Sequence, residues 1–123
     1  MKNIVIILVC SFLVGCSAIK GAFNLKEHDP ALALAYVDTK ITIYDAYCEE
    51  FETLENAYYQ AVWMHEYTIF VNDPHKETAE SIVSDIDRAL EYSEENIGVC
   101  NKFLKIARLK LKTLQKTWSS RWL

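Results

Sequence analysis

Long stretches of this chain lack the residues that end helices. Residues 31–71 contain neither glycine nor proline, and Gly98 is the only such residue between positions 75 and 118. The whole chain of 123 residues has three glycines and two prolines, too few for the turns of a typical all-β fold. Hydrophobic residues make up 51% and charged residues 24%, a composition typical of a folded domain. We therefore predict a small all-α protein.

An Asp-Pro pair stands at the start of each of these stretches, with the aspartates at Asp29 and Asp73. Aspartate is a favoured helix N-cap, and proline suits the first helical turn. The pattern predicts helices over about residues 30–71 and 74–118, each roughly 60 Å long at 1.5 Å per residue. Since almost nothing connects them, we expect them to fold back antiparallel.

Apolar residues recur along both predicted helices at alternating spacings of three and four, as in the seam of a coiled coil. Folding the chain at residues 72–74 places Cys48 opposite Cys100 and matches the other seam positions in the same register. The sequence therefore predicts an antiparallel two-helix coiled-coil hairpin over residues 29–123. Its matched pairs include Tyr44 with Leu104, Ile41 with Ala107, Val37 with Leu111, Phe51 with Ile97, and Val62 with Ile86.

The same register predicts a disulfide between Cys48 and Cys100. The bond would close a loop of about 50 residues, which in the chain-entropy model stabilises the fold by about 4 kcal/mol. The alternative is a pair of free thiols buried in the seam. The choice depends on the compartment, because disulfides persist in oxidising environments.

The compartment is indicated by the first residues. A short basic start is followed by an apolar run from Ile4 to Ile19, which is short for a membrane-spanning helix and typical of a secretory leader. Its end, Leu13-Val14-Gly15-Cys16, resembles the lipobox of bacterial prolipoproteins. The alternative is an uncleaved anchor with an incidental cysteine.

The resemblance to prolipoproteins implies a signal peptide over residues 1–15, cleavage before Cys16, lipidation of Cys16, and a tether over residues 16–28. Ser17 follows the lipidated position, where an aspartate would resemble the signal for retention in the inner membrane. We therefore expect a lipid-anchored protein of the bacterial envelope, on the inner leaflet of the outer membrane and facing the periplasm. The protein would bind the lipid bilayer through the acylated Cys16.

Charge is distributed unevenly along the chain. All 17 acidic residues lie between Glu27 and Glu95, and every charged residue after Glu95 is basic. The formal net charge of −4 disfavours a nucleic-acid partner. We predict that the basic, tryptophan-bearing end rests on anionic lipid headgroups near the anchor. The alternative is an ordinary solvated helix face. The predicted membrane-surface residues are Lys102, Lys105, Lys112, Lys116, Trp118 and Trp122.

Each predicted helix has more apolar residues than one seam can bury. The surplus residues occupy the c and g heptad positions and would leave one flank of a lone hairpin exposed. We therefore expect a homodimer, with two hairpins pairing into a four-helix bundle, or binding to another envelope protein. These flank residues are Ile43, Tyr47, Leu54, Ala57, Ala61, Met64, Val71, Ile82, Ala89, Tyr92, Val99, Phe103 and Ile106.

Three aromatic residues, Trp63, Tyr67 and Phe70, lie outside both the seam and this flank. Their spacing places them on one face of one helix. Exposed aromatics are typical anchors of protein interfaces, so we predict that these three bind a partner. In a hairpin they would lie near the tip, about 50 Å or more from the lipid. Alternatively, a helix bend or a second hairpin covers them.

The sequence contains no pattern typical of a catalytic, metal or cofactor site. The histidines, His28, His65 and His75, have no metal-ligand spacing, and the three glycines form no phosphate-binding loop. We expect no enzyme, no cofactor and no small-molecule substrate. The sequence favours a membrane-anchored interaction or envelope scaffold module. The alternative is a phage or mobile-element lysis or exclusion lipoprotein, such as an outer spanin subunit.

Overall fold

A computed structural model describes residues 29–122, with side chains as far as Ser120. This part of the chain forms four helices and no β-strand, which confirms the all-α prediction there. The predicted signal peptide, the tether and Cys16 lie outside the described residues, as does the side chain of Trp122. The helices are α2 (Pro30–Tyr44), α3 (Phe51–Phe70), α4 (Lys76–Tyr92) and α5 (Ile97–Trp122).

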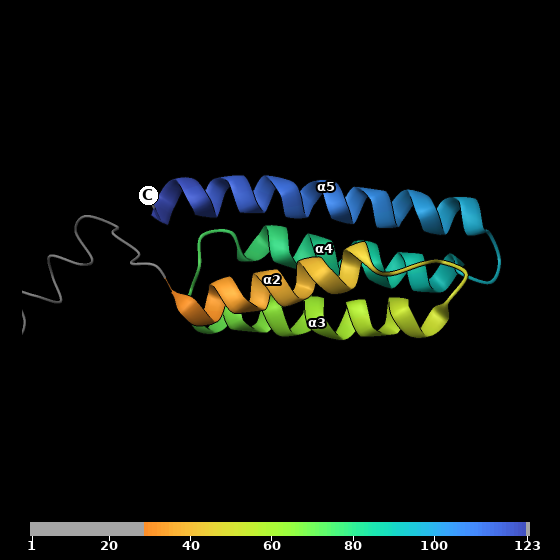
Figure 1. The fold of residues 1–123 in the computed structure, drawn as a ribbon, viewed down its shortest axis with the longest axis horizontal. Helices are drawn as coiled ribbons and strands as arrows, with labels where there is room; N and C mark the ends of the chain where they lie inside the picture. Colours follow the sequence, from red (N-terminus) through yellow and green to blue (C-terminus); the bar gives the residue numbers. More distant parts are fainter. Residues whose placement is uncertain (1–28, 123) are drawn as a thin grey trace, which may run out of the picture.

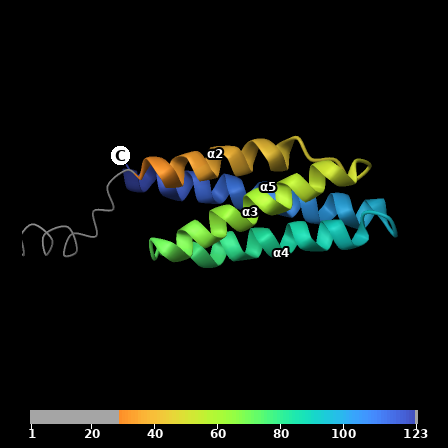
Figure 2. The same cartoon turned by 90° about the horizontal axis from the view of Figure 1, so that it is seen from below.

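The four helices run up and down around one core, and we call residues 29–122 the helical domain (Figures 1 and 2). α2 packs against α3 and α5, and α4 also packs against α3 and α5, whereas α2 and α4 are diagonally opposed. The start of α2, the end of α5 and the turn between α3 and α4 lie at one end of the domain.

The prediction of two continuous helices, over residues 30–71 and 74–118, is wrong. Each stretch is divided into two helices, at residues 45–50 and 93–96. The longest helix, α5, has 26 residues, which corresponds to about 39 Å at 1.5 Å per residue. The helical domain is therefore much shorter than the expected rod of roughly 60 Å.

The break between α2 and α3 contains neither glycine nor proline. Side chains from elsewhere in the domain bond the backbone groups that lose their helical partners at this break. The Arg108 guanidinium reaches from α5 and donates to the carbonyl oxygens of Ile43, Tyr44 and Ala46, at 3.4, 3.4 and 3.1 Å. Unpaired carbonyls at a helix C-terminus are a cost that such donors remove. The Thr53 hydroxyl accepts from the Tyr47 N–H at 2.9 Å and so braces the start of α3.

The second division has polar caps on both sides. The Ser93 hydroxyl donates to the Leu90 carbonyl at 2.8 Å, and Asn96 Oδ1 accepts from the Val99 N–H at 3.2 Å. Asparagine favours helix N-caps because its side-chain oxygen satisfies such an unpaired donor. Gly98 lies inside α5, so Asn96 rather than the glycine marks the boundary.

Because each long stretch is divided into two helices, about half of the predicted apolar flank is buried inside the domain, whereas Tyr47 is exposed. Both stretches fold in half, so the residues that predicted pairing with a second copy meet each other in one core. Conversely, part of the predicted seam is exposed, because the core stripe was assigned to the wrong side of the first stretch. The fully buried flank residues are Ile43, Leu54, Ala57, Ala61, Met64, Ile82 and Ala89, and the exposed seam residues are Val37, Ile41, Tyr44, Phe51 and Ile97.

The two predicted aspartate caps have different roles. Asp29 is the N-cap of α2, where its carboxylate accepts from the Ala31 and Leu32 N–H groups at 3.0 and 3.2 Å. Asp73 is buried and accepts from the His75 N–H at 2.8 Å, but α4 begins only at Lys76. Asp73 therefore stabilises the turn before α4 rather than capping the helix directly.

Candidate functional site

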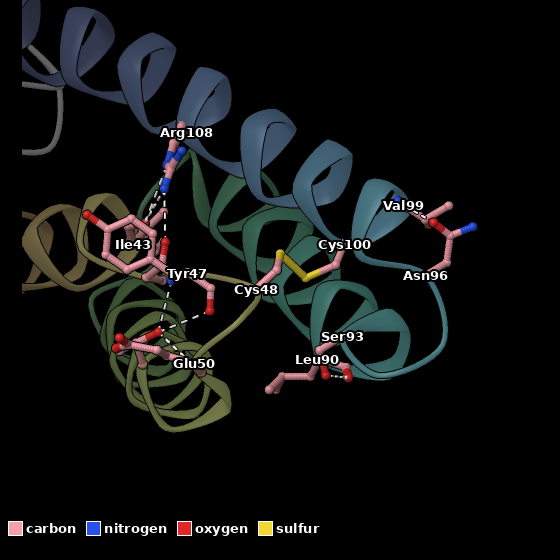
Figure 3. Close-up of a disulfide and its surroundings, with 12 residues drawn as sticks. Ile43, Tyr47, Cys48, Glu50, Leu90, Ser93, Asn96, Val99, Cys100 and Arg108 are labelled. Carbon is pink, nitrogen blue, oxygen red and sulfur yellow. Dashed lines mark hydrogen bonds between the residues drawn. A yellow bond between two sulfur atoms is a disulfide. The ribbon is translucent and has the colours of Figure 1, made fainter.

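The disulfide predicted from the register is present in the structure. Cys48, in the segment after α2, is bonded to Cys100 near the start of α5, with Cα atoms 6.1 Å apart and a sequence separation of 52 (Figure 3). Both cysteines are buried. The bond joins the segment between α2 and α3 to the first turn of α5, so it stabilises the folded-back arrangement.

The three predicted partner-binding aromatics, Trp63, Tyr67 and Phe70, lie on α3. Tyr59, one turn earlier on the same helix, is also exposed, and we call the four residues the aromatic surface. Trp63 is 53% exposed and Phe70 is 85% exposed. The ring of Tyr67 stacks on Trp63 at a centroid distance of 5.7 Å and contacts Phe70 at 6.4 Å. The rings of Trp63, Tyr67 and Phe70 therefore form one continuous patch, which no other helix of residues 29–122 covers.

The position of this patch differs from the prediction. The Tyr67 hydroxyl donates to both carboxylate oxygens of Asp29, at 3.1 and 2.9 Å. Desolvation, followed by the hydrogen bond to Asp29 and its charge, raises the pKa of Tyr67. The aromatic surface thus lies beside the first described residue, so the expected place at a distant tip is wrong. The reason is that the first stretch folds back on itself.

A groove continues the aromatic surface onto α2. It has a volume of about 270 Å³, and Leu34, Ala35 and Asp38 of α2 line one side while Gln60 and Trp63 of α3 line the other. Leu34 is exposed, so an aliphatic and an aromatic side chain are both available to a ligand here. The Asp38 carboxylate, and that of Glu66 between Trp63 and Phe70, make the surroundings acidic.

α2 carries a second apolar stripe on the side away from the core, which sequence reasoning missed as a surface. Leu34, Val37, Ile41 and Tyr44 follow the spacing of one helix face, and Val37 and Ile41 are 46% and 54% exposed. The signal was visible, because Val37, Ile41 and Tyr44 stand in the predicted seam. A coiled-coil period predicts these three residues in the core, but the period alone does not reveal which of two apolar stripes is buried.

The four predicted membrane-surface lysines are all exposed on α5: Lys102, Lys105, Lys112 and Lys116. Trp118 is only 1% exposed, so its predicted place at a membrane surface is wrong. Its ring meets Tyr36 edge-to-face at 5.7 Å, and its indole N–H donates to Asp73 at 3.3 Å. Trp118 is therefore a core residue that joins α5 to α2 and to the turn before α4.

Two other basic residues of α5 act within the domain. Lys110 Nζ lies 2.7 Å from Asp85 Oδ2, and this ion pair neutralises the buried Asp85 carboxylate. The same ammonium group donates to the Ser81 hydroxyl at 2.6 Å. Arg108 binds the end of α2, as described above. Among the basic side chains of α5 that the structure describes, the four exposed lysines are therefore available to a partner.

Residues 29–122 contain no group of three or more His, Cys, Asp or Glu side chains able to hold a metal ion. His65 lies in α3, and His75 precedes α4. No helix in this range is long and apolar enough to cross a membrane. The chain matches no known family model, and no curated protein or solved structure is detectably similar to it.

Proposed function

We propose that this protein is a non-enzymatic, lipid-anchored interaction module of the bacterial envelope. In this proposal Cys16 carries the lipid, and the helical domain faces the periplasm from the inner leaflet of the outer membrane. The sequence at residues 13–16 supports the anchor. The presence of a buried disulfide in the fold supports an oxidising compartment.

The observation that carries the proposal is the aromatic surface with its adjoining groove. Burial of aromatic rings is a large source of stability, and leaving several exposed on one patch is unusual for a protein without a partner. Trp63 and Phe70 project from a helix that the core holds rigidly, and the groove beside Leu34 offers a recess for a side chain. Such pre-organised aromatics are typical anchors of interfaces.

We propose another envelope protein as the partner of this surface. The acidic side chains of Asp38 and Glu66 next to the aromatics favour a partner that presents apolar and basic residues. They also disfavour an anionic bilayer at this site, because like charges repel. Since the surface lies beside Asp29, the partner would bind near the anchored end of the domain.

Processing of Cys16 tests the anchor. Cys16→Ala should accumulate as an unprocessed precursor, whereas the wild-type protein should be cleaved and lipidated in a globomycin-sensitive manner. Identical processing of both chains would rule out lipidation at Cys16. This assay is independent of the helical domain and of any partner.

Crosslinking of the full chain in intact membranes tests the aromatic surface. The variant Trp63→Ala/Phe70→Ala should lose the partner adduct and retain its helicity and melting temperature. The matched control is Glu80→Ala/Asp87→Ala, which has the same spacing on an exposed face of α4 and should retain the adduct. If both variants retain it, or if the aromatic variant melts early, the aromatic surface is not the binding site. An adduct that contains only a second copy would replace the envelope partner with a homodimer.

A further inference from the structure

The face between α2 and α5 combines apolar and basic side chains. From α2 it receives the exposed Val37, Ile41 and Tyr44, and from α5 the exposed lysines. Contacts between the helices show that they share this face: Lys40 Nζ donates to Gln115 at 3.2 Å, and Arg108 lies 5.7 Å from the centre of the Tyr44 ring. We call this surface the α2–α5 face.

The lysines of α5 lie next to these bridging residues. Lys112 is one helical turn from both Arg108 and Gln115, and Lys105 and Lys116 continue the row in the two directions along the helix. Lys40 adds a cation from α2, where it lies 5.9 Å from the centre of the Tyr44 ring. An apolar stripe is thus flanked by a row of positive charge.

Most acidic residues lie on other sides of the domain, and one exposed carboxylate, that of Asp45 at the C-cap of α2, lies a helical turn from Ile41. α5 contains no aspartate or glutamate, and Asp38 of α2 lines the groove toward α3. α4, which is diagonal to α2, is strongly acidic: Glu77, Glu80, Asp87 and Glu91 are all exposed. The charge of the domain is therefore oriented, because the exposed charges of α5 are basic and those of α4 are mainly acidic.

We propose that the α2–α5 face rests on an anionic phospholipid surface, so that the domain lies along the membrane and α4 points away from it. Lysines near such a surface are attracted to its headgroups, while apolar residues enter the interfacial layer. A second copy that binds through the same face fits less well, because its lysines would meet the lysines of the first copy. This inference rests on the proposed membrane anchor, which would hold the face near a bilayer.

The length of chain before the domain permits this contact. Twelve residues, 17–28, separate Cys16 from Asp29, and an extended chain of that length spans at most about 40 Å. α2 begins directly at the end of that segment, and its apolar stripe starts within the first turns. The face that we assign to lipid therefore lies within reach of an anchor at Cys16.

Amine-reactive labelling of the full chain on vesicles tests the inference. The chain is mixed with vesicles of phosphatidylcholine alone or of phosphatidylcholine with an equal part of phosphatidylglycerol, and each lysine is quantified by peptide mass spectrometry. Lys105, Lys112 and Lys116 should be protected on the anionic vesicles, and high salt should remove the protection. Lys76, at the start of α4, should label equally in all samples.

Variants identify the residues that make the contact. Lys112→Gln, read at Lys105 and Lys116, should reduce protection about fivefold, the contribution of one lysine near an anionic surface. Ile41→Ser should also reduce it, because the apolar contact is lost. The control Glu80→Gln/Asp87→Asn raises the net charge on α4 without changing this face and should leave the protection pattern unaltered.

Three results would overturn the inference. Equal labelling on both kinds of vesicle would show no anionic lipid contact. Protection that is already complete on neutral vesicles would show that another segment or a second copy covers the face. Protection of Lys76 together with the others would show adsorption without orientation. None of these results depends on Cys16 processing or on the aromatic surface, so failure here and failure of the proposed function are distinguishable.

Discussion

α2 and α4 occupy diagonal positions in the same domain, yet their solvent-facing sides differ. α4 buries Ala79, Ile82, Ile86 and Ala89, and its exposed residues are mainly charged. α2 buries a comparable stripe of Leu32, Ala35, Tyr36 and Ile43, but it also exposes Leu34, Val37, Ile41 and Tyr44. One buried stripe therefore suffices for a helix to pack in this fold.

This comparison shows that the outward apolar stripe of α2, from Leu34 to Tyr44, is not needed for packing. α4 shows the usual arrangement for a helix whose outer side meets only water, with one apolar face and one polar face. An apolar side chain exposed singly is ordinary, but a stripe of four on one helix, next to the aromatic surface of α3, is not. We conclude that α2 is a shared edge of two contact surfaces.

The inward sides of the two helices should be equally important for stability. Ile43→Ala in α2 and Ile86→Ala in α4 should each lower the free energy of unfolding by about 2–5 kcal/mol, because both side chains are fully buried and leave a cavity. Urea denaturation of the full chain in detergent measures both. A cost below that range for Ile43 alone would mean that α2 is only loosely packed.

The disulfide should be the next largest contribution. Cys48→Ala/Cys100→Ala should lower the free energy of unfolding by about 2–4 kcal/mol, because the bond restricts the unfolded chain. Wild-type protein treated with a reductant is the matched comparison and should lose a similar amount. No change in either sample would show that the segment after α2 and the start of α5 hold their places without the bond.

The stability of the domain at alkaline pH should depend on Tyr36, a buried residue of α2. Burial, and secondarily the charge of Tyr44, raises the pKa of Tyr36 to about 12 from its usual 10. The unfolded chain therefore loses this proton first, so stability is intact below about pH 10 and falls as the pH rises toward 12. The loss attributable to Tyr36 should reach about 2–3 kcal/mol.

Tyr36→Phe is the control for this titration. It removes the hydroxyl that donates to Leu111 and Gln115, at 3.2 and 3.1 Å, so it should be less stable than wild type at neutral pH. Its stability should then fall less steeply between pH 10 and 12. Equal slopes for the two proteins would show that Tyr36 does not carry the alkaline transition.

The outward stripe should have the smallest effect on stability. Val37→Ser and Ile41→Ser should each change the free energy of unfolding by no more than about 0.5 kcal/mol, as is usual at exposed sites. Ser84→Ala, on the exposed side of α4, is the matched control. A loss above 1 kcal/mol at Ile41 alone, on the scale of a buried side chain, would show that the stripe supports the fold.

The sequence predicted the helical class, the reversal near residue 73, the Asp29 cap and the pairing of Cys48 with Cys100. These features depend on local chemistry or on strict periodicity, which a single chain displays. The outward placement of Trp63 and Phe70 also followed from their position relative to the apolar stripes. The anchor at Cys16 stays a prediction, because it lies outside the structure.

The division of each long helix could not be predicted from glycine or proline. The carbonyls freed at Tyr44 and Ala46 are satisfied by Arg108, which is distant in sequence. Asn96 was a visible N-cap signal near the second division, but a heptad pattern ran through it. Two apolar stripes on one helix are compatible with either choice of core, and only tertiary packing decides between them.

The central claim is that the outer side of α2 is a contact surface and that of α4 is not. Photo-crosslinking in intact membranes tests it most directly, with a photoreactive residue in place of Leu34 in one chain and of Ser84 in another. We predict a discrete adduct with another envelope protein from position 34 and none from position 84. Equal adducts from both positions, or none from position 34, would contradict the account.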